Sequence, residues 1–151
     1  MTEPAMVPGQ VDGLAEPDAL PSPTPVSAPY YAAAARGELV FQRCGNGHPF
    51  LYPRSLCPVC HSTQLTWEPS SGRGAIVTFA PVNRPPWNEI ERATPYVVVL
   101  VRLDEGPQLM STLENADPSD VRIGQAVRAV FEPVDEDVAL VRFVPAGRNE
   151  R

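Results

Sequence analysis

Lysine is absent from this chain of 151 residues, whose twelve basic residues are all arginine and are outnumbered by eighteen acidic residues. The net charge is −6, and residues 1–29, with four acidic and no basic residues, carry most of it. The rest of the chain is close to neutral. Electrostatic binding of a nucleic-acid backbone needs a basic stripe that releases counterions. The composition therefore argues against a nucleic-acid partner, and it remains compatible with a small anion held by a few arginines.

Long apolar runs are also missing. No stretch approaches the roughly 20 apolar residues that a membrane span requires, and the first residues lack the basic start and apolar core of a secretory signal. We therefore expect no membrane association and no export. Only three cysteines are present, and two of them form Cys57-Pro-Val-Cys60. Thiols kept reduced for a metal are the better interpretation of that pattern, so a cytoplasmic location is expected.

Proline and glycine, in contrast, are abundant, with 19 and 10 residues. This composition favours short strands joined by turns and predicts a mainly β fold. Residues 1–29 hold seven prolines and no repeating apolar face; we expect a disordered, proline-rich tail, either without a specific role or acting as a partner-docking arm. The expected modules are a helix with a small ribbon at residues 30–70 and a barrel at residues 71–146, followed by a short tail at residues 147–151.

The first element expected is a short alanine-rich helix in YYAAAARG, beginning after Ser27 or Pro29 and broken near Gly37. A strand is expected next, at Leu39–Arg43. A helix of this length is marginal in isolation, so we expect it to pack against the module that follows.

The stretch QRCGNGHPFLYPRSLCPVCHS holds every cysteine and both histidines of the chain. Its candidate metal ligands are Cys44, His48, Cys57 and Cys60. Zinc prefers four tetrahedral thiolate or imidazole donors, and paired turns of this spacing supply them. The intervening PFLYPRSL is expected to form two short arms crossing at Pro53, and QLTWEP a further arm. This pattern predicts a rubredoxin-like zinc ribbon, in which four protein ligands leave no open position and the zinc is structural.

One position departs from the usual ribbon, because Gly47 stands where a second cysteine is expected. His48 can fill that place one residue later, whereas His61, directly beside Cys60, is poorly placed. Two alternatives stay open. One is a metal-free ribbon packed by Phe50, Tyr52, Leu56 and Trp67. The other is an iron-containing electron carrier, against which the presence of three cysteines instead of four argues.

The second half of the chain reads as strands and turns. Five β-rich runs lie at residues 74–83, 95–105, 107–115, 125–134 and 138–145. The segments DEGP and DED are hairpin signals, and ADPSDVRIG indicates a capped helical turn between the third and fourth strands. Five strands in this arrangement predict a Greek-key barrel of the oligonucleotide/oligosaccharide-binding type, the OB-fold.

These features together resemble a family of paired zinc-ribbon and OB-fold proteins, formerly catalogued as a domain of unknown function and associated with acyl-CoA thiolases and thiolase-like aldolases. The resemblance runs through YYAAAARGELVFQRC, YPRSLCPVC, WEPSSGRGAIVTF, PYVVVLVRLDEGPQLMSTLE, IGQAVRAVFE and LVRFVPA. It implies a non-catalytic accessory subunit that binds a thiolase-like enzyme, in some cases bridging it to a second acyl-CoA enzyme such as a hydratase. It also implies lipid or steroid side-chain metabolism, with retro-aldol cleavage in some members and acyl-CoA bound at the ribbon–barrel junction in others.

The residues agree that catalysis is not intrinsic, because no nucleophile elbow, phosphate loop or dinucleotide fingerprint is present. If CoA binds, its phosphates need guanidinium donors, and the candidates are Arg73, Arg84 and Arg92. Trp87, in a proline-rich loop, either caps the barrel or contacts the partner. The edge formed by Tyr52, Pro53 and Arg54 is the other expected contact. The competing hypothesis is a single-stranded nucleic-acid-binding OB-fold, which needs stacked aromatics and a basic groove. The absence of lysine, the acidic total and the small number of strand aromatics, Phe79, Tyr96, Phe131 and Phe143, argue against it.

Overall fold

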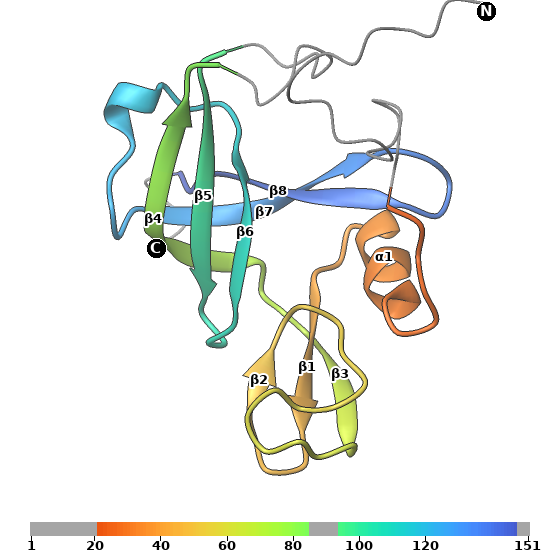
Figure 1. The fold of residues 1–151 in the computed structure, drawn as a ribbon. Coiled ribbons are helices and arrows are strands. Elements are labelled where there is room, and N and C mark those ends of the chain that lie inside the picture. Colours follow the sequence, from red (N-terminus) through yellow and green to blue (C-terminus); the bar gives the residue numbers. More distant parts are fainter. Residues whose placement is uncertain (1–20, 85–93, 148–151) are drawn as a thin grey trace, which may run out of the picture.

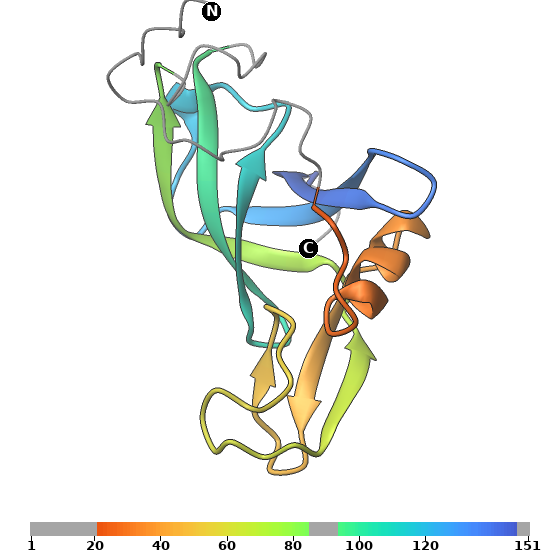
Figure 2. The ribbon, with the colours of Figure 1, turned by 45° about the vertical axis from the view of Figure 1, so that its right-hand side comes forward.

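The structure, a computed structural model, describes residues 21–84 and 94–147. It is mainly β, with one α-helix, a small three-stranded ribbon and a closed five-stranded barrel (Figure 1). Figure 2 shows the ribbon projecting from one end of the barrel, with the helix in the angle between them. The predicted fold class is confirmed. No helix in the described ranges is long and apolar enough to cross a membrane.

Helix α1 spans Ala28–Ala35, and Gly37, just beyond its C-cap Arg36, terminates it with a φ of 79° that suits glycine. Residues 24–27 before it form a hydrogen-bonded turn, in which Ala28 N–H donates to Thr24 O at 2.7 Å. The hydroxyls of Thr24 and Ser27 also bond to each other and to the turn backbone. These bonds order the proline-rich segment from residue 24 onward. Residues 1–20 of the expected tail lie outside the described residues.

The ribbon consists of β1 (Val40–Cys44), β2 (Pro49–Phe50) and β3 (Leu65–Pro69), in the order β2-β1-β3. The expected strands before the first cysteine and in QLTWEP are confirmed. The prediction of two arms in PFLYPRSL was half wrong, since only the two-residue β2 forms a strand. The backbone of Arg54 bonds to the side chain of Gln42 instead of to a neighbouring strand.

The barrel strands are β4 (Arg73–Val82), β5 (Tyr96–Leu103), β6 (Gln108–Leu113), β7 (Ala126–Pro133) and β8 (Ala139–Pro145). They close in the order β4-β5-β6-β8-β7, with β6 and β8 parallel and β4 pairing with β7. All five predicted strands are present within two residues at each end. The 3-10 turn Pro118–Asp120, capped by the Asp117 side chain, confirms the helical turn expected between the third and fourth strands.

Two hydrophobic clusters hold the described residues together. The larger fills the barrel and includes Val99, Val101 and Phe143, none of which is measurably exposed. It continues into the base of the ribbon through Phe41 and Leu51. The smaller cluster, at the far end of the ribbon, has only Cys44, Phe50 and Cys57 as buried members, with Leu65 packed against them. Two of the four candidate ligands, Cys44 and Cys57, are therefore part of the smaller core.

Candidate functional site

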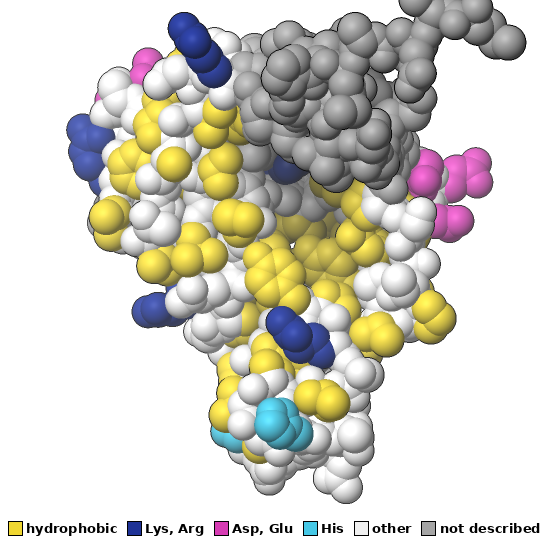
Figure 3. Space-filling model, viewed as in Figure 1, with side chains coloured by type: hydrophobic (Ala, Val, Ile, Leu, Met, Phe, Trp, Pro, Cys, Tyr) yellow, Lys and Arg dark blue, Asp and Glu magenta, His cyan; other side chains and the backbone are white. Residues whose placement is uncertain are grey.

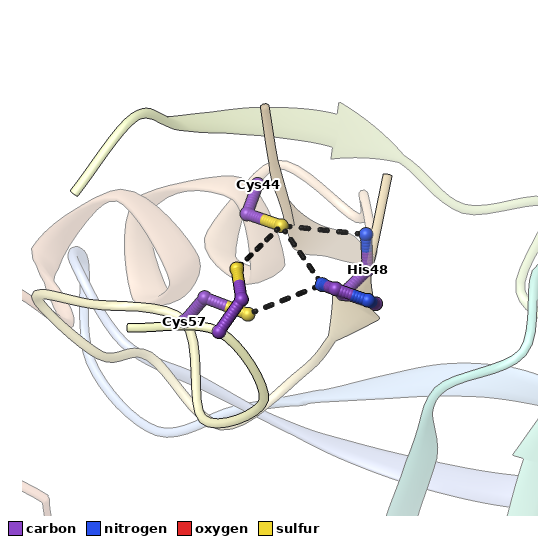
Figure 4. A group of neighbouring side chains, drawn as sticks. Cys44, His48 and Cys57 are labelled. Carbon is purple, nitrogen blue, oxygen red and sulfur yellow. Dashed lines mark hydrogen bonds between the residues drawn. The ribbon is translucent and has the colours of Figure 1, made fainter. Parts of the chain in front are cut away.

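The four predicted metal ligands converge at the far end of the ribbon. Cys44 ends β1, His48 immediately precedes β2, and Cys57 and Cys60 come from the loop between β2 and β3. Their ligand atoms all lie within 4.8 Å of one another. Figure 4 shows the side chains of Cys44, His48 and Cys57 pointing toward a common centre. Strand pairing of β1 with both neighbours brings the two turns together, although thirteen residues separate Cys44 from Cys57.

The distances within this group fit zinc. Cys44 Sγ lies 3.3 Å from His48 Nδ1 and 3.8 Å from Cys60 Sγ, and Cys57 Sγ lies 3.8 Å from His48 Nδ1. A tetrahedral zinc with ordinary Zn–S and Zn–N bonds separates its ligand atoms by about 3.5–3.8 Å. The set of three thiolates and one imidazole is typical of a structural site. With four protein donors, no position is left for a reacting water.

Gly47 explains how the ribbon manages without its usual cysteine. Its φ is +89° and its N–H donates to Cys44 O at 2.8 Å, so the first turn is closed by a residue in the left-handed region. The turn carries the next residue, His48, back toward Cys44. His48 N–H then donates to Cys44 Sγ at 3.4 Å. An imidazole one residue later therefore takes the place of the missing thiol.

The surroundings of the thiols favour the charged form at two positions. The side-chain amide of Asn46 donates to Cys60 Sγ at 3.3 Å and is the main cause that lowers the Cys60 pKa to about 6. Burial opposes the thiolate at Cys44, but backbone N–H groups of His48 and Asn46 outweigh it, and the Cys44 pKa is lowered. Cys57 is fully buried, and burial raises its pKa. A cation would stabilise all three thiolates.

The metal-free alternative is not favoured by the packing. Of the four residues that would fill such a core, Tyr52 is 50% exposed and Leu56 is 41% exposed. Only Phe50 joins the small cluster of buried residues. His61 is exposed, has a φ of 58°, and lies outside the group of converging ligands. So small an apolar core needs an additional source of stability, and the four donors provide it when zinc is bound.

Gln42 was missed by sequence reasoning. It is the only buried polar side chain in the described part of the chain, at 4% exposure. Its amide N–H donates to Arg54 O at 3.0 Å, and its amide oxygen accepts from Arg54 N–H at 2.8 Å. These two bonds hold the loop that leads to Cys57. A glutamine in a strand gives no local signal of this role, because its partner lies twelve residues away.

Tyr52, Pro53 and Arg54, the expected contact edge, do not all have the same surroundings. The Tyr52 hydroxyl accepts from Met110 N–H of β6 at 3.1 Å, so this residue joins the ribbon to the barrel. Pro53 borders a groove of about 260 Å³ at that junction. The groove is lined from α1 by Tyr30 and Tyr31, from β6 by Leu109, Met110 and Ser111, and from β8 by residues 139–142. Arg54 is exposed and, with Pro53, lines a second hollow of the ribbon.

The predicted phosphate-binding arginines do not converge in the described residues. Arg73 begins β4 and Arg84 lies beyond its other end, ten residues of extended strand away. Arg73 instead faces Arg128 directly across the β4–β7 pair, and Arg102 of β5 faces Ala75, two residues after Arg73. Side chains alternate between the two faces of a strand, so all three positions are on the same, outer face of the sheet. The predicted Trp87 and Arg92 fall outside the described residues.

The strand aromatics of the barrel, which nucleic-acid stacking would need, are only partly accessible. Phe143 is fully buried, and Phe79 and Phe131, both half-buried, pack against the barrel core. Tyr96, also half-buried, lines a shallow hollow together with Phe131. Stacking of bases requires exposed aromatic faces, so Phe143 cannot take part, and none of the other three is fully exposed.

Both parts of the chain match known families. The family described as "ChsH2, rubredoxin-like zinc ribbon domain" matches residues 32–66, and the family described as "ChsH2, C-terminal OB-fold domain" matches residues 67–132. A DUF35 domain-containing scaffold protein from Pyrococcus furiosus is 31% identical over 118 residues, which cover 74% of this chain and 86% of that protein.

Two further similar proteins have names that refer to enzymes. The 3-oxo-4,17-pregnadiene-20-carboxyl-CoA hydratase alpha subunit of Mycobacterium tuberculosis is 33% identical over 134 residues, which are 85% of this chain but only 42% of that longer protein. A chain of the solved Ltp2-ChsH2(DUF35) aldolase superposes with a TM-score of 0.74 at 29% identity. That superposition covers 85% of this chain and 100% of the other.

Proposed function

We propose a function for this chain from the family to which it belongs: it is a member of the DUF35 family of zinc-ribbon and OB-fold proteins. We infer that it is a non-catalytic accessory subunit of a thiolase-like enzyme that acts on acyl-CoA thioesters. The single observation that carries this proposal is the match, over the full length of the other chain, to a component of an aldolase named for two proteins. The scaffold name of the archaeal relative supports the same role.

The described side chains support a role without chemistry of its own. General acid–base catalysis needs a histidine or a buried carboxylate near a nucleophile. In the described ranges, His48 belongs to the metal centre, His61 is exposed, and Gln42 is the one buried polar side chain. Zinc bound by four protein ligands would stabilise the ribbon and would not activate water. The reaction would therefore take place on the partner.

We also propose that the acyl-CoA meets this subunit at the groove between ribbon and barrel. The groove is lined largely by aromatic and aliphatic side chains, including Tyr30, Tyr31 and Met110. Arg142 is its charged lining residue, and it is paired with Glu132 at 2.8 Å. Such a surface suits the acyl portion better than the phosphates. The hydratase relative supports a steroid CoA ester as the substrate class, and the solved aldolase supports retro-aldol cleavage as the reaction of the partner.

A reducing, cytoplasmic setting is part of the proposal, because three thiols reserved for zinc need one. A second enzyme of the hydratase type is a further proposed partner. The competing nucleic-acid function is less well supported, since the chain has no lysine and Phe79, Phe131 and Phe143 lie in or against the core.

The experiment is to co-express the full chain with the thiolase-like enzyme whose gene lies nearest to its own and to purify by a tag on one of them. We expect a complex of defined mass that cleaves or transfers its acyl-CoA substrate, while the purified chain alone gives no turnover. Turnover by the chain freed of every co-purifying enzyme would overturn the non-catalytic role. Failure of the two proteins to associate at micromolar concentration would overturn the partnership.

A further inference from the structure

Exposed apolar side chains gather around the second turn of the metal centre. Val59 is 66% exposed, Leu56 is 41% exposed and Val26, from the turn before α1, is 39% exposed. Val26 and Leu56 line one shallow hollow of about 600 Å³, together with Pro53, Arg54, Pro58 and His61. Figure 3 shows apolar side chains over the ribbon and the waist above it, with basic and histidine side chains among them. We call the surface of Val26, Arg54, Leu56, Pro58 and Val59 the knuckle face.

The metal centre does not require this apolar character. Cys57 and Cys60 turn inward as ligands, so the two residues between them face outward. Val59 serves the centre only through its backbone N–H, which donates to Cys57 Sγ at 3.4 Å. A polar side chain would serve equally well there and would not expose apolar area to water. The valine and the neighbouring leucine therefore indicate contact with another molecule.

The knuckle face is also held in a fixed shape. The backbone of Arg54 is bonded at both its N–H and its C=O to the buried Gln42 side chain. Val26 lies inside the turn closed by Thr24 and Ser27, whose hydroxyls are 3.0 Å apart. A surface that is ordered before binding loses little conformational entropy when a partner arrives. This organisation suits a stable protein–protein contact.

Charge selects between possible occupants. Residues 39–67 contain no aspartate or glutamate, and Arg54 is an exposed residue of the face. A second copy of this chain docking through the same face would present another arginine and, from residues 39–67, no carboxylate to pair with Arg54, a like-charge arrangement that costs affinity. A surface with apolar side chains and a carboxylate opposite Arg54 is complementary. The expected occupant is therefore a different protein.

We propose that the knuckle face is the surface on which the thiolase-like partner docks, with Val59 and Leu56 in its apolar centre and Arg54 paired with a carboxylate of the partner. This inference rests on the proposed function, since it names the surface that the accessory subunit uses. The zinc centre would then have a second role. By holding residues 56–60 in place, the metal would shape the contact surface as well as stabilise the fold.

The test is titration of the co-expressed thiolase-like enzyme with the full chain and four variants. Val59→Asp is expected to weaken binding by about thirtyfold or more, as burial of an unpaired carboxylate at an interface centre does. Its matched control is Ile123→Asp, which places the same charge at a position 70% exposed on the barrel and should bind within about twofold of the parent. Arg54→Glu is expected to lose about tenfold, and Arg54→Lys to stay within about threefold.

Each outcome decides between the two proposals. Zinc content and circular dichroism establish that a variant is folded; if Val59→Asp loses zinc, the pair Arg54→Glu and Arg54→Lys carries the test alone. If the parent binds the enzyme and Val59→Asp and Arg54→Glu bind as tightly as Ile123→Asp, the knuckle face is not the docking surface, while the proposed function is still supported. If the parent does not bind the enzyme, both the docking surface and the proposed function are contradicted. A parent that self-associates, with Val59→Asp monomeric, assigns the face to a second copy and overturns the proposal.

Discussion

The metal end of the ribbon and the barrel reach their stability in different ways. The barrel contributes most of the larger buried cluster, with alternating strand residues such as Val97, Val99 and Val101 turned inward. The metal end has three buried residues, two of which are candidate ligands. Apolar burial stabilises in proportion to area, so it suffices for the barrel and not for the metal end. The comparison leads us to expect that the metal end needs zinc to fold and that the barrel does not.

Removal of zinc should produce the largest difference in stability between the metal end and the barrel. Structural zinc contributes roughly 10–16 kcal/mol in small zinc-binding domains, far more than the metal-end cluster can supply. We expect Cys57→Ser to lose zinc and to disorder residues around the centre while the barrel signals in an NMR spectrum persist. Metal analysis and amide spectra measure this. His61→Ala, outside the ligand group, should keep about one zinc per chain; zinc retained by Cys57→Ser would contradict the assignment.

A cavity in the barrel core should destabilise the barrel and leave zinc binding by the ribbon intact. Phe143 is fully buried in β8 and pairs with Leu113 where β6 meets β8. Phe143→Ala is expected to lower the free energy of unfolding by about 3–5 kcal/mol, measured by urea titration. The folded fraction should still bind zinc, because the cavity is remote from the ligands. Ile123→Ala, at an exposed position, should change stability by less than about 0.5 kcal/mol. Equal losses in both variants would show that the barrel core is not where the structure has it.

Gln42 sharpens the comparison, because it stabilises the ribbon through hydrogen bonds to backbone instead of apolar burial. Gln42→Leu leaves Arg54 N–H and C=O without these partners, and we expect a loss of about 2 kcal/mol. Exchange of the Arg54 amide hydrogen should accelerate more than that of barrel amides. Gln64→Leu is the matched control, since Gln64 is exposed. Unchanged protection of the Arg54 amide would exclude the proposed role.

Glu105 connects the two regions and should give the smallest effect. Its carboxylate accepts from Ser71 N–H at 2.6 Å and from Ser70 Oγ at 2.9 Å, across the linker between β3 and β4. Burial opposes the charge, but these bonds prevail and lower the Glu105 pKa from its ordinary value of 4.5. A lowered pKa stabilises the fold above pH 4.5, and this contribution disappears as the pH falls through the lower folded value.

The corresponding variant is Glu105→Gln. We expect it to be less stable than the parent at pH 7, by about 1 kcal/mol or less because the side chain is partly exposed. The difference should shrink as the pH falls below 4.5. Urea titrations of parent and variant at matched pH measure it, and zinc loss in acid affects both proteins alike. A difference that grows in acid would have the wrong sign for this account.

Local patterns in the sequence were sufficient for much of the fold and for the metal ligands. Strand alternation, hairpin residues and the Cys–His spacing each act within about ten residues, which is the range over which side-chain periodicity and turn geometry are set. They predicted all five barrel strands and the four converging ligands. The second arm in PFLYPRSL was wrong because its strand-like composition was outweighed by the distant Gln42 side chain.

Tertiary structure alone decided which distant residues meet. Val26 and Leu56 line one hollow, Tyr52 bonds to Met110, and Arg73 faces Arg128, although 30 to 58 positions separate the members of each pair. Strand register and closure of the barrel set these encounters, and neither leaves a mark in the local sequence. The sequence by itself determined that the chain would be a zinc ribbon followed by an OB-fold. The proposed contact surface and the junction groove are built by residues that only long-range packing brings together, so the local sequence could not predict them.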